Sequence, residues 1–145
     1  MTSQDQLDEL YSACLDMAAA LLEKNGEFFP IAFELAADGQ IRGIAVMEED
    51  EQPPSQQVID SLLYVLRERA ASGAIMAAAM AVDIRVRQDP EAVPRDAVQV
   101  RLRAADYARD VISPYTIATS GLFRKTRKLH LDTSYAQAAE NDVFA

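Results

Sequence analysis

The sequence has one cysteine, one histidine and no tryptophan, and it has no long apolar run. A single cysteine, Cys14, excludes an intrachain disulfide and a cysteine-rich zinc site, and it fits a reducing compartment. Cys14 lies on the apolar side of a predicted helix, so we expect a buried, inert thiol. The longest apolar runs, Met17–Leu22 and Ala74–Val82, are well short of the ~20 residues that span a bilayer. We therefore expect no transmembrane helix.

Basic residues are also few. The chain carries 14 Lys and Arg against 23 Asp and Glu, a formal charge of −9, which argues against a nucleic-acid-binding protein because phosphate contacts dominate that affinity. The first ten residues are acidic and polar, where a secretory signal is basic and then apolar. We expect a cytoplasmic protein that binds neither nucleic acid nor membrane.

The charge is unevenly distributed along the chain. Between Ile84 and Lys128 there are 10 Lys and Arg against 5 Asp and Glu, whereas the rest of the chain has 4 against 18. Either the two regions neutralise each other across the fold, or the basic region meets an acidic partner or the acidic region of a second copy.

Two segments have the apolar spacing of amphipathic helices. The first runs from about Asp5 to Lys24, begins with a capping box formed by Ser3 and Gln6, and ends at Asn25-Gly26. The second follows Ser55 and ends at Gly73. Between them, Asp38-Gly39 separates two strand-like segments and predicts a β-hairpin, because both residues of a type I′ turn need positive φ.

The stretch Ile75–Arg87 alternates like a strand throughout, and we expect it at the centre of a sheet. A second alternating segment, Ala97–Ala105, predicts an antiparallel hairpin with it, and weaker strand patterns follow. Residues 134–145 form a polar tail, with a short helical turn expected over Tyr135–Glu140 and Phe144 as an anchor. The predicted domain therefore covers residues 1–133.

The order of elements predicts an α+β fold of order α-β-β-α-β-β-β. We expect a two-layer sandwich, in which an antiparallel sheet of about five strands has both main helices on one face. The uncovered face would then need a partner, and a homodimer is the expected one. Its predicted contact residues are the apolar side of the central strand: Met76, Met80, Val82 and Ile84.

Three segments carry a resemblance to known proteins: Gly26–Ala32 (GEFFPIA), the Asp38-Gly39 turn, and Pro53-Pro54-Ser55 before the second helix. Over about its first two thirds the chain resembles a group of small uncharacterised bacterial proteins. The resemblance implies a shared fold and brings no activity with it. The order of elements is also similar to roadblock-type dimerisation domains and, less closely, to the small acidic chaperones of type III secretion.

Four arginines are the best candidate for a binding site. If the two alternating strands form a hairpin, one face would display Arg85, Arg87, Arg101 and Arg103 together. The alternatives are an ordinary charged surface, docking of an acidic partner segment, or binding of a small anion.

Other candidates for chemistry are weaker. Arg124–Lys128, next to Leu122 and Phe123, has the composition of a membrane or nucleic-acid patch, but pairing with the acidic run Glu48–Glu51 is the favoured interpretation. His130 is the only histidine, and no spacing supports a triad of His130 with Ser113 or Ser120 and Asp132. We predict no catalytic residue, metal site or cofactor.

These observations favour a non-catalytic protein-interaction module, such as a dimeric adaptor, an immunity-like protein or a chaperone. The alternative is a small enzyme with a carboxylate-based or histidine-based site in a pocket between helix and sheet. A nucleic-acid or membrane binder would need the arginine strands and Arg124–Lys128 to form one continuous basic surface.

Overall fold

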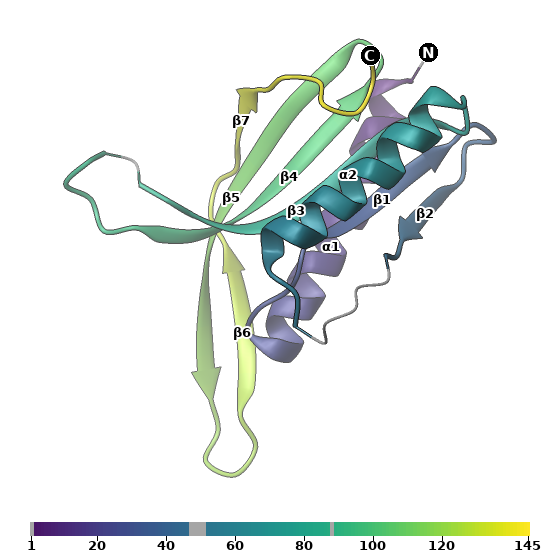
Figure 1. Ribbon diagram of the computed structural model, residues 1–145. Helices are drawn as coiled ribbons and strands as arrows, with labels where there is room; N and C mark the ends of the chain where they lie inside the picture. The colour runs from purple at the N-terminus through teal and green to yellow at the C-terminus, as the bar shows by residue number, and fades with distance from the viewer. Residues whose placement is uncertain (1, 47–51, 88) are drawn as a thin grey trace.

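The computed structural model describes residues 2–46, 52–87 and 89–145. In these residues two helices, α1 (Gln4–Asn25) and α2 (Ser55–Ala71), flank one antiparallel sheet (Figure 1). The strands are β1 (Ile31–Ala36), β2 (Ile41–Ile44), β3 (Ile75–Val86), β4 (Arg95–Ala104), β5 (Tyr107–Ser120), β6 (Thr126–Leu131) and β7 (Tyr135–Ala138). The predicted α+β class and antiparallel sheet are confirmed, and the sheet has seven strands instead of about five.

The sheet is open, with the strand order β2-β1-β3-β4-β5-β6, and β7 pairs with β5 next to β6. As predicted, β3 is central, since it pairs with β1 on one side and with β4 on the other. The Asp38-Gly39 hairpin is also present, with Phe33 opposite Gly43 and Glu34 opposite Arg42 in its register. Its turn is not of type I′, because Gly39 has a φ of 88° whereas Asp38 does not have a positive φ. This arrangement leaves β2 as one edge of the sheet.

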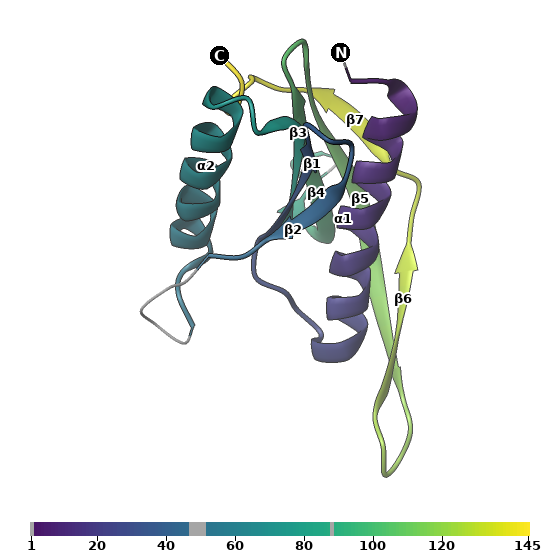
Figure 2. The ribbon, with the colours of Figure 1, turned by 90° about the vertical axis from the view of Figure 1, so that its right-hand side faces the viewer.

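The two helices lie on opposite faces of the sheet (Figure 2). Ala77, Ala79 and Ala81 of β3 pack in one cluster with α1, whereas Ala78 and Met80 pack in a second cluster with α2. The prediction that both helices share one face is therefore wrong. Because β3 is apolar on both sides, both sides need cover, and each receives a helix. We call the two sides of the sheet the α1 face and the α2 face.

An ion pair fastens α2 to the sheet. The carboxylate of Glu34 in β1 is 3% exposed, and it accepts hydrogen bonds from Nε and Nη2 of Arg69 at 2.5 and 2.8 Å. This two-pronged contact satisfies a buried charge, which would otherwise cost several kcal/mol. It also fixes the position of α2 along the sheet, over β3 and β1.

The C-terminal residues belong to the domain and do not form a separate tail. Tyr135–Ala138 is strand β7, where a helical turn was predicted, because it pairs with Arg109–Ile112 of β5. After it, Val143 is buried in the cluster beneath α2, and Phe144 packs against the same cluster. These contacts tie residues 135–144 to β5 and to the cluster beneath α2, and the anchoring role expected for Phe144 agrees with its packing. Over the described ranges, no helix is long and apolar enough to cross a membrane.

Candidate interaction surfaces

The four arginines predicted to share one face are separated. Arg101 and Arg103 lie opposite Met80 and Ala78 on the α2 face. Arg85 lies opposite Asp96 on the other face, 3.4 Å from its carboxylate. The register places odd-numbered residues of β3 opposite even-numbered residues of β4, so odd-numbered arginines in the two strands point to opposite sides.

Two of these arginines have clear local partners. Arg87 follows the end of β3 and donates from Nη1 to the carbonyl of Pro90 at 3.3 Å. Arg101 donates from Nε to the side chain of Gln99 at 3.0 Å. Neither contact creates a shared site, and the predicted four-arginine docking surface is not formed.

Arg103 is buried, with 4% of its surface exposed. Its guanidinium lies 2.9 Å from Asp110 and 2.8 Å from Asp142, and it also donates to the carbonyl of Arg109 at 3.1 Å. Two carboxylates therefore balance one buried cation, which connects β4, β5 and the C-terminal segment. This is a structural network, and it leaves Arg103 no free surface for a partner.

The face predicted for a homodimer is largely covered by the chain itself. Met80 and Val82 are 2% and 5% exposed because α2 lies over them, and Ile84 packs against the same cluster. The β1–β3 register shifts at Ala36, and Met76 packs against the cluster beneath α1. These four side chains therefore do not present one apolar face to a second subunit.

The most prominent exposed feature is the outer part of the β5–β6 hairpin, residues 116–130, which we call the arm. Figures 1 and 2 show its outer end projecting beyond both helices, whereas Ile117 and Leu129 at its base pack against the cluster beneath α1. Two apolar side chains occupy its turn, and Leu122 and Phe123 are 97% and 102% exposed. Scattered exposed apolar residues are normal, but two adjacent ones at a projecting turn, where polar residues usually lie, indicate a contact site.

A glycine determines the shape of this turn. Gly121 has a φ of +107°, in the region that favours glycine, and a Cβ built on it would lie 2.1 Å from the carbonyl oxygen of Arg124. Any other residue at this position would have to change the turn. The conformation that displays Leu122 and Phe123 therefore depends on Gly121.

Cations surround the apolar turn. Arg124, Lys125, Arg127 and Lys128 follow it directly, and three of them, Arg124, Lys125 and Lys128, are exposed and make no ion pair with any residue that the structure describes. The pairing predicted with Glu48–Glu51 lies outside the described residues. The arm thus combines an apolar tip with free positive charge on a chain whose net charge is −9.

Helix α1 anchors the base of the arm. Arg127 donates from Nη1 to the carbonyl of Lys24 at 2.9 Å, at the end of α1, and the side chain of Glu23 accepts from the backbone N–H of Leu129 at 3.2 Å. A cation at this end of a helix is favoured by the helix dipole. These contacts orient the hairpin and leave its tip free.

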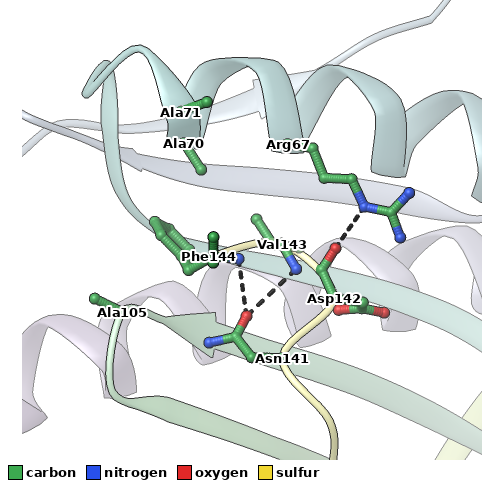
Figure 3. Close-up of a pocket in the computed structure, with 9 residues that line it drawn as sticks. Arg67, Ala70, Ala71, Ala105, Asn141, Asp142, Val143 and Phe144 are labelled. Carbon is green, nitrogen blue, oxygen red and sulfur yellow. Dashed lines mark hydrogen bonds between the residues drawn. The ribbon is translucent and has the colours of Figure 1, made fainter.

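A pocket lies where the C-terminal segment meets α2 (Figure 3). Its volume is about 500 Å³, and its lining comprises Arg67, Ala70 and Ala71 of α2, Ala105 after β4, and Asn141–Ala145. Figure 3 shows a turn within the segment, in which Asn141 accepts from the backbone N–H groups of Val143 and Phe144, and it shows Arg67 of α2 donating to the carbonyl of Asp142. On the other side, Asn141 donates to the carbonyl of Ala104 at 2.6 Å.

The lining of this pocket bears on the enzyme alternative. Asp142 is its one acidic side chain, and that carboxylate is already held by Arg103 at 2.8 Å. The remaining lining is mostly alanine and Phe144. This pocket therefore offers no free carboxylate side chain as a general base, and the small-enzyme alternative stays a prediction.

The candidate triad is not assembled. The hydroxyl of Ser113 is buried and lies 2.7 Å from that of Ser134, and Asp132 pairs with Arg95 at 2.6 Å. His130 is an exposed residue of β6 opposite Thr116. Within residues 2–46, 52–87 and 89–145, no three His, Cys, Asp or Glu side chains are grouped so that they could hold a metal ion.

Three titratable groups beneath α1 have raised pKa values: the buried Cys14 and Tyr115, and the half-buried Asp83. Burial raises the pKa of the Cys14 thiol to about 12, so it is protonated at neutral pH. The hydroxyl of Tyr115 donates to Asp83 at 2.7 Å, and burial is the main cause of the raised pKa of each. Cys14 and Tyr115 are features of the packed core, since Cys14 is 0% and Tyr115 is 6% exposed.

No protein-family model, curated protein or solved structure matches the chain. The functional argument therefore depends on the geometry of the described residues.

Proposed function

We propose that the chain is a non-catalytic protein-interaction module that binds an acidic partner through the arm. One observation carries the proposal: a turn shaped by Gly121 displays two fully exposed apolar side chains, Leu122 and Phe123, among cations without ion-pair partners in the described chain. The site predicted from the sequence, an arginine face on β3 and β4, is replaced by this hairpin.

The two kinds of side chain contribute differently to binding. Full burial of a leucine or phenylalanine stabilises by about 1.5–3 kcal/mol each, so Leu122 and Phe123 can supply the central contacts of a small interface. The exposed Arg124, Lys125 and Lys128 contribute mainly to the rate and orientation of encounter, because exposed charges are strongly hydrated and screened. The partner is expected to offer an apolar pocket with an acidic rim.

The charge of the whole chain favours a protein partner over a polyanionic surface. An extended anionic surface, such as a nucleic acid or an anionic membrane, would repel the acidic body while attracting the arm. A protein with a local acidic patch avoids most of this repulsion, because charges separated by more than about 8 Å are screened at physiological salt. The cytoplasmic location and the homodimer expected from the sequence stay predictions.

Photo-crosslinking in an extract of the native cells tests the proposal. Phe123 is replaced by the photoreactive p-benzoylphenylalanine, and the crosslinked peptide is identified by mass spectrometry. We expect one protein, crosslinked at an acidic segment, and a yield that falls when Arg124, Lys125 and Lys128 are changed to Gln. The matched control places the same photoreactive residue at Val93, which is 82% exposed on the β3–β4 connection.

Four results would count against the proposal. Equal crosslinking from positions 123 and 93 would indicate nonspecific contact. A crosslink to lipid would favour membrane binding, and a crosslink to nucleic acid would favour that class of ligand. A crosslink yield that does not change with the three Gln substitutions would show that the cations of the arm do not contribute to binding.

A further inference from the structure

A second candidate interaction surface is the free edge of the sheet at β2, and it is independent of the arm. β2 is the outermost strand beside β1, and Ile41–Ile44 contains no proline and no bulge. Natural edge strands are commonly protected by short length, charged side chains, proline, a bulge or a covering segment. β2 is four residues long and its one charged side chain, Arg42, is paired with Asp38 at 3.0 Å, so the edge is only partly protected. We infer that this edge, together with the groove beside it, binds an extended basic peptide as an added strand.

The register determines which backbone groups of β2 are available. The N–H of Ala36 donates to the carbonyl of Gln40 at 2.8 Å, so that pair is a hydrogen-bonded one. Hydrogen-bonded and non-hydrogen-bonded pairs alternate in an antiparallel ladder, so Glu34 and Arg42 also bond across it. The backbone N–H and carbonyl groups of Ile41 and Gly43 therefore face away from the sheet.

A groove next to this edge can receive side chains of the added strand. It lies between the end of β2 and α2, has a volume of about 580 Å³, and is lined by Ala45, Val46, Asp60, Ser61, Tyr64 and Val65. Tyr64 is 66% exposed. When a peptide adds to a sheet edge, backbone hydrogen bonds supply affinity, and pockets for alternate side chains supply specificity. Because only Ile41 and Gly43 of β2 offer outward groups, apolar contacts in the groove carry much of the binding.

Charge selects a basic peptide over a second copy of the chain. Asp60 lines the groove and forms no ion pair with any described residue, whereas Arg42 is already paired with Asp38 at 3.0 Å. Two copies meeting at β2 would bring together two chains of net charge −9 and would place no added cation beside Asp60. A peptide with apolar residues at alternate positions and one Lys or Arg matches both the groove and Asp60.

Panning of a random ten-residue peptide display library on the immobilised protein tests this inference. We expect enriched sequences with alternating apolar residues and a basic residue. One such peptide is then synthesised, and its affinity is measured by fluorescence polarisation. Gly43→Pro removes an outward N–H and should weaken binding by about tenfold or more, whereas Gly43→Ala keeps that N–H and should change it less than about twofold.

The control is well matched because a Cβ at Gly43 would lie 3.8 Å from Phe33, an ordinary contact. If Gly43→Pro does not fold, the unchanged protein is titrated with the peptide instead, and the NMR chemical shifts of the Ile41 and Gly43 backbone amides are followed. Absence of alternating basic sequences, equal binding by both variants, or unshifted amides would overturn the inference. Concentration-dependent self-association that Gly43→Pro abolishes would overturn it in favour of a second copy.

Replacing Leu122 and Phe123 by Ser should leave peptide binding at β2 unchanged. Failure of the peptide site is thus distinguishable from failure of the arm.

Discussion

The Nε atom of Arg103 lies 2.8 Å from Oδ1 of Asp142, and this contact joins the middle of the sheet to the C-terminal segment. Arg103 is 4% exposed, so removal of its charge leaves Asp110 and Asp142 without the cation that both contact. This contact explains why the last residues belong to the domain, and it gives the first prediction.

Arg103→Ala should lower the free energy of unfolding by about 3–5 kcal/mol, the usual cost of breaking a buried ion pair. Urea denaturation followed by circular dichroism measures it. Arg85→Ala is the matched control, because its side chain is 77% exposed and lies 3.4 Å from Asp96; we expect a change below about 1 kcal/mol. Equal losses in the two variants would show that the network around Arg103 is not structural.

Asp83 predicts a pH dependence of stability. Burial, the main cause, raises the pKa of Asp83 above its unfolded value of about 3.9. The stabilisation that comes from its protonated form is therefore complete below the unfolded pKa and is lost as the pH rises through the folded pKa. The amide in Asp83→Asn does not titrate. As the pH is lowered from 7 to 4, the free energy of unfolding of the unchanged protein should therefore increase relative to that of this variant.

Urea denaturation of both proteins at the two pH values provides the comparison. The amide keeps an oxygen that can accept from Tyr115, which makes the variant a close structural match. A relative loss of stability of the unchanged protein on acidification would mean that the pKa of Asp83 is lowered, contrary to the account.

Cys14 should resist alkylation in the native state. At a pKa of about 12 compared with the ordinary 9.0, the thiolate fraction near pH 8 falls by about a thousandfold, and the side chain is also fully buried. Iodoacetamide labelling followed by mass spectrometry should be slow in buffer and rapid in denaturing urea. Similar rates in the two solutions would place Cys14 at the surface.

Gly121→Ala should disturb the arm without unfolding the domain. The substitution combines an unfavourable positive φ with a clash against Arg124, whereas Gly39→Ala has a positive φ of 88° and nothing within 4 Å of the new Cβ. Strain of this kind costs about 1–3 kcal/mol. We expect faster hydrogen exchange in the arm and weaker partner capture from Gly121→Ala only, with the exchange of α1 and β3 amides unchanged in both variants.

Much of the fold followed from local patterns. The capping box of Ser3 and Gln6 and the Gly26 end of α1 are present, with Gly26 at φ 79°. The Asp38-Gly39 hairpin and the central position of β3 were also predictable, because turn chemistry and alternation act within a few residues. These signals depend on neighbours in sequence, which the sequence displays directly.

The errors concern relationships between distant residues. Apolar side chains on both sides of β3 indicated two covered faces, but the sequence did not show that α1 and α2 would divide them. Arg85 and Arg101 lie on opposite faces because odd-numbered residues of β3 pair with even-numbered residues of β4. A one-residue shift in this register would place both arginines on the same face. The strand β7 exists only because β5 provides a partner.

The candidate site was visible in part. Arg124–Lys128 beside Leu122 and Phe123 was recognised as a basic and apolar segment, but composition alone does not show that its turn projects from the body. The one local signal that was missed is Gly121, which lies between a strand-like segment and two apolar residues. A glycine in that position indicates a specific turn.

The affinity of the arm for the acidic segment identified by crosslinking is the most direct test of the proposed function. Isothermal titration calorimetry compares the unchanged protein with the Leu122→Ser, Phe123→Ser double variant and with Val93→Ser. Loss of two buried apolar contacts should weaken binding by about a hundredfold or more, whereas Val93→Ser should leave it within about twofold. Equal affinity of all three proteins would contradict the account.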